Sequence, residues 1–335
     1  MNRNYFSIFV FIVAVSIFFI IIFPSVHLNE FVAGLEKIDI PIYGLALVFL
    51  LFSNMFAALR WSVLMQQAGA EKSRGFVNAF GIFSLGQATG LIVPTRVGSY
   101  SKVPLVMNLD NIPSEHALAA VNAETIIDMI YICGAGFVSL IIISIPLSVN
   151  LFLSSLLILI IIVCLIAGCV ILWRIHSFKE KFKNLYADSS DTNQGDLKTI
   201  LTVIPGKIFD LIISTKKIFS QRSVVVKLVI FTLITQFLGV IGFFLVIEST
   251  HTTLPLITVF AILTLSFLVG VLSMIPGGLG ASDLSMIVLL EHAGIALPIA
   301  TNIALLWRFA MYIPILAVSS IFLIKMQALP EKNNN

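Results

Sequence analysis

The chain has 335 residues, of which 59% are hydrophobic and only 11% are charged, and its formal net charge is +3 at pH 7. Ordinary soluble domains carry roughly 25% charged residues, so this composition excludes a soluble globular fold. It predicts an all-α polytopic membrane protein.

Long apolar runs recur along the chain, and most of them reach the roughly 20 residues that a helix needs to cross about 30 Å of hydrocarbon. Only Arg3 precedes the first run and no small-x-small cleavage pattern follows it, so we expect an uncleaved anchor helix rather than a secretory signal. The runs are Tyr5–Phe23, Ile42–Leu59, Ala117–Ile145, Leu151–Trp173, Val224–Ile247, Leu254–Ile275 and Ala300–Ile324.

The distribution of lysine and arginine predicts the orientation, because cytoplasmic loops carry these residues in excess. The segment from Arg174 to Lys227 holds ten of the twenty Lys and Arg residues, so we expect it to be cytoplasmic. Arg60, Lys72 and Arg74 mark a second cytoplasmic loop, and basic residues near both ends of the chain put the termini on the same side. We therefore expect a multi-pass protein of the bacterial cytoplasmic (inner) membrane with both termini cytoplasmic.

We expect a single integral membrane domain over residues 1–335. It divides into an anchor helix with an outer loop (1–40), a first repeat (41–145), a connecting span with the cytoplasmic loop (146–223), a second repeat (224–325) and a tail (326–335). Within the cytoplasmic loop, Lys207–Ser220 is expected to form an amphipathic helix lying on an anionic leaflet, with an ordinary linker helix as the alternative.

The division into repeats comes from two segments, 90–99 and 274–283, that share a Pro-x-x-x-Gly core. Their prolines, Pro94 and Pro276, are 182 residues apart, and the glycines that close the two cores keep the same offset. If each core is the tip of a re-entrant helical hairpin, the chain has about six full transmembrane helices. The two hairpins then form an inverted repeat, a common plan of transporters with a mid-membrane substrate site.

The composition of the tips favours a break in the helix. Proline lacks the N–H that would continue a helix, and glycine tolerates backbone angles that are closed to other residues. The second arm of each hairpin would begin with free N–H groups and a positive helix dipole, which suit an anion. The expected tip residues are Pro94, Pro276 and Gly277, and the glycines expected beside the substrate are Gly98, Gly278 and Gly280.

Charged residues converge on the same elements, although each one costs about 2.5 to 3.5 kcal/mol at the centre of a membrane helix. We expect Arg96 and Arg308 to bind an anionic substrate group, and Glu124, Asp128 and Asp283 to balance charge or carry a coupled proton. Glu124 and Asp128 are four residues apart and so share a helical face.

The polar residues can also be interpreted as structural, without a role in binding. The charged residues can instead pair with one another to hold the bundle together. Arg60, next to Trp61, is interpreted as an interfacial anchor. Five amides are assigned either to contacts between helices or to the lining of a cavity: Asn54, Gln87, Asn122, Gln236 and Asn302.

At these residues the chain resembles the lysylphosphatidylglycerol synthase transmembrane-region family, also called flippase-like domain proteins. The resemblance rests on Pro94–Gly98, Pro276–Gly280 and Leu305–Arg308. Two positions depart from the family pattern, because Ser99 stands where the family has Glu and Asp283 replaces another Glu. Since only a short tail follows the last span, the resemblance implies the translocating module without a domain that attaches lysine to phosphatidylglycerol.

We therefore expect a flippase-like carrier that moves an anionic lipid or a lipid-linked head group between leaflets. The alternatives are a secondary transporter of a small water-soluble solute and, less favoured, an intramembrane lipid-modifying transferase. The chain has no HExxH, GxSxG or Walker A pattern, and we expect no enzyme, no catalytic residue, no cofactor and no metal. The expected partner is a membrane lipid or lipid-linked substrate, with no nucleic acid; homo-oligomerisation is left open.

Overall fold

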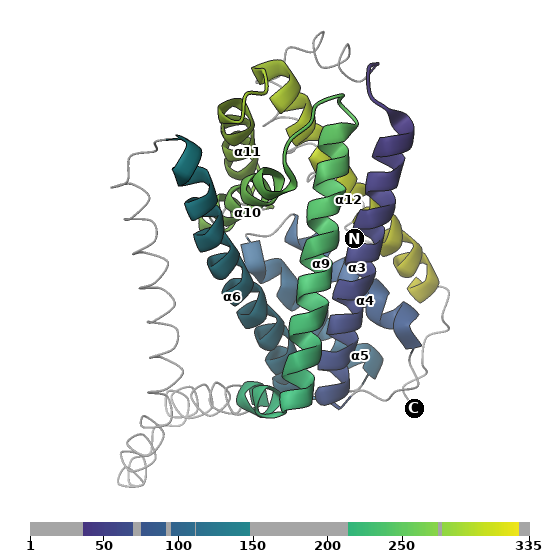
Figure 1. The fold of residues 1–335 in the computed structure, drawn as a ribbon. Helices are drawn as coiled ribbons and strands as arrows, with labels where there is room; N and C mark the ends of the chain where they lie inside the picture. The colour runs from purple at the N-terminus through teal and green to yellow at the C-terminus, as the bar shows by residue number, and fades with distance from the viewer. Residues whose placement is uncertain are drawn as a thin grey trace, which may run out of the picture.

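The computed structural model describes residues 36–69, 75–91, 95–110, 112–147, 214–273 and 277–327. Throughout these ranges the regular secondary structure is helical, and they contain no strand (Figure 1). The predicted spans Tyr5–Phe23 and Leu151–Trp173 lie outside the described residues, as do Pro94, Pro276 and most of the predicted cytoplasmic loop. For Arg96 the backbone is described but the side chain is not.

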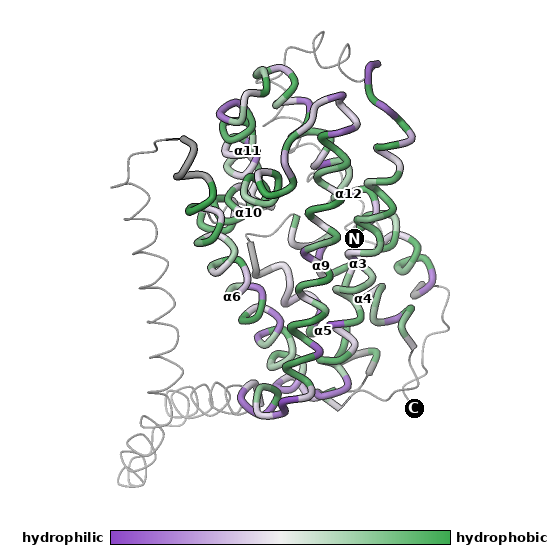
Figure 2. Tube along the Cα trace, in the orientation of Figure 1, coloured by the Kyte–Doolittle hydropathy of each residue, from purple (hydrophilic) through white to green (hydrophobic). Residues whose placement is uncertain are grey.

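Four helices in the described ranges are long and apolar enough to cross a membrane: α3 (Ile40–Gln67), α6 (Ser114–Leu147), α9 (Arg222–Glu248) and α12 (Leu297–Gln327). Figure 2 shows that apolar residues dominate them. Large side chains such as Phe237 and Ile321 are 60% and 68% exposed, which suits a surface facing lipid. The prediction of an all-α polytopic membrane protein is thereby confirmed; the count of six spans and two re-entrant hairpins stays a prediction.

Shorter helices pair into two helical hairpins. In the first, α4 (Gly75–Gly90) packs against η3 (Thr95–Ser101), which continues into α5 (Lys102–Asp110). In the second, α10 (Leu256–Leu272) packs against α11 (Ala281–His292). The first hairpin closes tightly, because the Thr89 hydroxyl donates to the Gly98 carbonyl at 2.9 Å, and a Cβ on Gly98 would collide with Gly90.

Helix boundaries recur at the offset found in the sequence. Helix α3 begins at Ile40 and α9 at Arg222, while α4 ends at Gly90 and α10 at Leu272; both differences are 182. The backbone N–H of Asp39, just before α3, donates to the carbonyl of Ser249, just after α9, at 2.9 Å. These two long helices therefore lie side by side and run in opposite directions (Figure 1).

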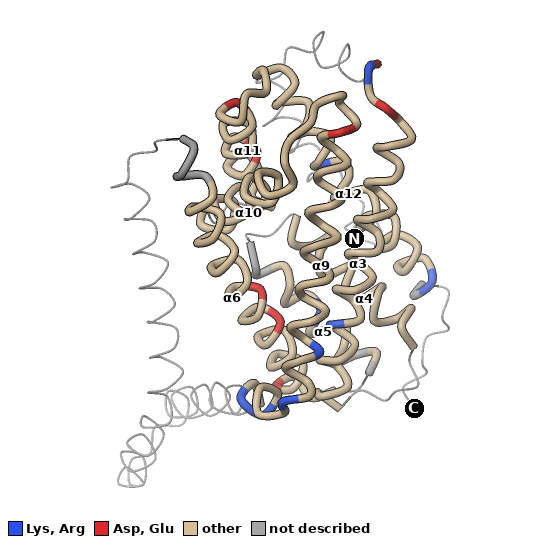
Figure 3. Tube along the Cα trace, viewed as in Figure 1, with Lys and Arg blue, Asp and Glu red and all other residues tan. Residues whose placement is uncertain are grey.

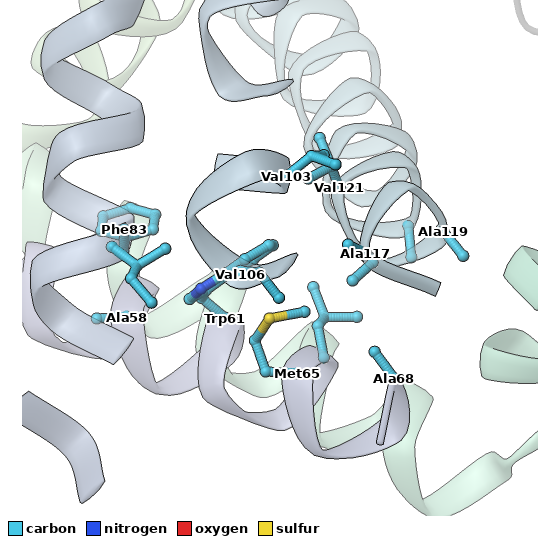
Figure 4. Close-up of a cluster of buried hydrophobic side chains, with 14 of the residues drawn as sticks. Ala58, Trp61, Met65, Ala68, Phe83, Val103, Val106, Ala117, Ala119 and Val121 are labelled. Carbon is cyan, nitrogen blue, oxygen red and sulfur yellow. The ribbon is translucent and has the colours of Figure 1, made fainter. Parts of the chain in front are cut away.

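The first helix of each short hairpin packs against a long helix from the other half of the chain. Helix α4 packs against α12, and its counterpart α10 packs against α6. One buried cluster lies among α3, α4, α5 and α6, where Trp61, Phe83 and Val106 meet small alanines (Figure 4). Small residues let helices approach closely, which is how helices associate where the surrounding lipid is as apolar as their own surfaces. A second cluster lies around Phe243 and Trp307, whose ring centroids are 4.9 Å apart.

Candidate functional site

The two hairpin tips meet at a cavity inside the bundle. A Cβ placed on Gly277, in the second tip, would lie 3.4 Å from the carbonyl oxygen of Leu91, in the first. The cavity has a volume of about 310 Å³ and is lined by α3, α6, α9, α10, α11 and α12 as well as both tips. Its polar lining consists of Ser53, Asn54, Arg60, Gln87, Ser99, Asp128, Tyr131, Thr235, Gln236, Thr264, Ser266, Ser282, Asp283, Arg308 and Tyr312.

Arg60 of α3 forms the first charged pair at this cavity, and its side chain is almost fully buried. Its Nη1 donates to Asp128 Oδ1 at 2.5 Å and to the hydroxyl of Thr232, on α9, at 2.9 Å. Its Nη2 donates to Glu124 Oε1 at 3.3 Å. One guanidinium therefore joins three long helices, and the two carboxylates of α6 accept from it on their shared face.

A second buried cation completes this cluster. Lys102, at the start of α5, is only 1% exposed and donates from Nζ to Glu124 Oε2. The same Nζ lies 4.4 Å from the ring centroid of Trp61 and 5.2 Å from that of Phe83. Aromatic faces attract a desolvated ammonium, so the pocket compensates part of the cost of burial. Figure 3 shows the acidic stretch of α6 with basic residues on the helices near it.

Four charges thus balance within the Arg60 cluster, which consists of Arg60, Lys102, Glu124 and Asp128. Two cations face two carboxylates, as a dry site requires, because an unpaired charge in a low-dielectric interior is far more costly than a matched pair. Glu124 lies between both cations, and neither Glu124 nor Lys102 lines the cavity. Arg60 and Asp128 do line it.

Arg308 of α12 forms the second charged pair. Its Nε donates to Asp283 Oδ1 at 2.5 Å and its Nη2 to Asp283 Oδ2 at 2.9 Å, which is a bidentate contact. The remaining donors reach the carbonyls of Gly277 at 2.8 Å and Gly278 at 3.2 Å, and the hydroxyls of Ser282 and Tyr312. Every N–H of this guanidinium has an acceptor within the protein.

The second tip has the backbone that its glycines predicted. Gly277, Gly278 and Gly280 have φ angles of 59°, 64° and 80°, in the region that side chains disfavour. Asp283 Oδ2 accepts the N–H of Gly280 at 3.0 Å, so the carboxylate caps the start of α11 while it holds Arg308. The Gly277 carbonyl, in the turn, accepts from the same arginine, and the Gly278 carbonyl accepts both from it and from the backbone N–H of Ser282.

The structure brings some of the predicted site residues together and leaves others apart. Arg308, Asp128, Asp283, Gly277 and Gly278 all line the cavity. Three others do not line it: Glu124, Gly98 and Gly280. The alternative was that the charged residues pair with one another. Each predicted charged residue whose side chain is described does have an oppositely charged partner. The amides divide as well, because Asn54, Gln87 and Gln236 line the cavity, while Asn122 accepts the hydroxyl of Tyr100 at 2.5 Å.

The interpretation of Arg60 as an interfacial anchor is wrong. Arg60 and Trp61 are 4% and 0% exposed, because α3 continues to Gln67 and carries both residues into the bundle. Lys102 was missed altogether. A signal for Arg60 was present in the sequence: Leu64 and Met65 extend the apolar pattern one turn beyond it. Lys102 offered no such signal, since it follows the tip within a polar stretch.

Metal ligation has no support within the ranges that the structure describes. In them, no three His, Cys, Asp or Glu side chains gather in a way that would hold an ion.

Comparison with known proteins places the chain in a family. A search of curated proteins returned no significant match. Among protein families, residues 7–319 match the Lysylphosphatidylglycerol synthase TM region, which covers most of the chain and agrees with the resemblance carried by the tip motifs. The chain is therefore a member of the lysylphosphatidylglycerol synthase TM region family.

Proposed function

We propose that this protein is a flippase-like carrier that translocates an anionic lipid or a lipid-linked head group between the two leaflets of a membrane. The observation that carries the proposal is the cavity at the meeting point of the two hairpin tips, which presents two buried arginine–aspartate pairs within a bundle of apolar helices. Ionisable groups are costly at membrane depth, so they are expected where a polar group passes.

The arrangement of the two halves supports transport. The helix boundaries recur at a constant offset, and α3 runs antiparallel to its counterpart α9. Both features support an inverted-topology repeat, in which two halves rock about a central site to open it alternately to each side. The substrate's anionic group would meet arginine in the cavity, and we assign Arg308 and the sequence-predicted Arg96 to this role, with Asp128, Glu124 and Asp283 balancing the charge.

The proposed setting is a bacterial inner membrane, with six full spans, two hairpins entering from opposite sides and both termini cytoplasmic. Single cysteines in a background without Cys133, Cys164 and Cys169 test this topology through labelling by an impermeant reagent. A cysteine at Lys198 should label only from the cytoplasmic face. Labelling of that position from outside would contradict the scheme.

Reconstituted translocation tests the function itself. Purified protein in liposomes should speed the flipping of a fluorescent phosphatidylglycerol, measured by quenching of the outer leaflet, over the rate in protein-free liposomes. Arg308→Gln should lose this activity, while Ile321→Ala, on the exposed surface of α12, should keep it. A wild-type protein that leaves lipid flipping unchanged but carries a water-soluble anion across the bilayer would replace the proposal with the solute transporter.

A further inference from the structure

The two arginines at the cavity differ in how many of their donors are used. Arg308 donates to six acceptors and has no N–H left over. Arg60 donates to three acceptors, and its Nε has no hydrogen-bond partner among the described residues although it is buried. Proteins seldom leave a buried guanidinium donor unsatisfied, so spare capacity at Arg60 points to a ligand.

Two hydroxyls on neighbouring helices share this condition. Thr235 Oγ1 on α9 and Ser266 Oγ on α10 are buried without a hydrogen-bond partner in the part of the chain that the structure describes. Ser266 is only 1% exposed as a whole residue. Both residues line the same cavity as Arg60. One cation and two hydroxyl donors, from three different helices, therefore line one cavity. This combination of donors is suited to binding an oxyanion.

From this we infer that Arg60, Thr235 and Ser266 form an oxyanion-binding site for a phosphate-type group, in which Asp128 is the internal counter-ion that the incoming anion replaces. The inference deepens the proposed carrier function and rests on it for the identity of the substrate. It adds Arg60 to the arginines that the proposed function assigns to the anion, because Arg60 has a buried donor without a partner among the described residues.

The two carboxylates of the Arg60 cluster have different parts in this site. Glu124 accepts from both Arg60 and Lys102 and lies away from the cavity, so it holds the guanidinium in place from behind. Asp128 lines the cavity, and its side chain is 13% exposed. An anion arriving from the cavity meets Asp128 and leaves the Lys102 and Glu124 contact intact. Lys102 is therefore a positioning residue.

Binding measurements on purified protein in nanodiscs of a zwitterionic lipid test the site. The probes are inorganic phosphate and the water-soluble dihexanoyl phosphatidylglycerol, titrated by calorimetry. Arg60→Gln should lose binding of the anionic probe. Asp128→Asn should bind it at least roughly tenfold more tightly, because the competing negative charge is gone. Binding of the lipid probe alone identifies a lipid head group, and equal binding of phosphate identifies a free oxyanion.

Variants of the hydroxyl residues test the site independently, in case Arg60→Gln does not fold. Thr235→Val and Ser266→Ala should each weaken binding severalfold. Ser139→Ala is the control, because Ser139 is also a fully buried hydroxyl without a hydrogen-bond partner among the described residues, but it does not line the cavity. Its affinity for the probe should equal that of the wild type.

Several results would overturn the inference. They are failure of both probes to bind the wild type, wild-type affinity in Arg60→Gln, and unchanged or weaker affinity in Asp128→Asn. The last result would mean that the Arg60 and Asp128 pair only braces the bundle. These outcomes are separate from failure of the carrier proposal, since a protein that binds the probe at Arg60 without moving lipid would keep the site and lose the function.

Discussion

The Arg60 cluster and the Arg308 pair lie at one cavity but are built in different ways. Arg60 reaches Asp128, 68 residues away, and Thr232, 172 residues away, so this cluster ties together three separate long helices. Arg308 reaches Asp283, only 25 residues away, and the turn just before it. The contacts of Arg60 therefore depend on how three long helices pack, whereas the contacts of Arg308 stabilise the turn of one hairpin.

Helix boundaries in the two halves recur at an offset of 182, but the charged residues do not follow this offset. Asp128 on α6 and Arg308 on α12 are 180 residues apart and carry charges of opposite sign. Arg60 corresponds at 182 to Gly242. Matching helix boundaries therefore leave room for unequal roles, and mutations in each half should have different consequences.

The largest effect is expected at Arg308. Arg308→Gln should abolish lipid flipping and lower the free energy of unfolding by about 3–5 kcal/mol, because a buried carboxylate and the Gly277 carbonyl lose the arginine as a partner. Thermal unfolding in detergent and flipping at matched protein levels measure the two effects. Adding Asp283→Asn should recover part of the stability but none of the transport; additive losses of stability would show that the two residues do not interact.

Next in size is the effect of the buried lysine. Lys102→Met should destabilise the protein by about 3 kcal/mol, because the buried carboxylate of Glu124 would lose its contact with the ammonium and keep only its contact with Arg60. Unfolding measured for Lys102→Met and for Lys102→Met with Glu124→Gln checks the reason. The double variant should be more stable than the single one. If Lys102→Met is as stable as the wild type, the ammonium is not needed to balance the cluster.

The glycines of the second tip should show a smaller loss of stability together with a full loss of transport. Valine at Gly278 or Gly280 must adopt a positive φ, which costs about 1–3 kcal/mol, and a Cβ on Gly278 would lie 3.2 Å from the Cα of Gly270. We expect insertion and expression to persist while flipping stops. Gly134→Val is the control, because a Cβ there meets nothing within 4 Å and Gly134 does not line the cavity. Normal flipping in both tip variants would remove the tip from the mechanism.

The smallest effect is expected at Ser99, in the first tip. Ser99 lines the cavity where the family pattern has glutamate. Ser99→Glu should weaken binding of the anionic probe by roughly tenfold, equivalent to about 1.4 kcal/mol, since a negative charge would stand near the proposed site. Ser99→Gln, of similar size but neutral, should bind like the wild type. Equal weakening in both variants would indicate crowding instead of charge.

Much of the fold followed from local patterns in the sequence. Apolar runs of spanning length predicted α3, α6, α9 and α12, and the spacing of Pro94 and Pro276 predicted the offset at which helices recur. The same pattern predicted that Gly277 and Gly278 belong to a turn, and they have positive φ. These features are readable because helix formation, apolar burial and glycine geometry depend on neighbours along the chain.

What the sequence determined by itself was the class of protein, the offset of 182 at which helix boundaries recur and the presence of charge in its interior. Only the tertiary structure decided which charge meets which. Glu124 and Asp128 were predicted to share a face, but their partners, Arg60 and Lys102, come from helices whose positions depend on long-range packing. Coulomb attraction selects the nearest desolvated partner in space, and distance in space between packed helices is not encoded in the spacing of residues along one helix.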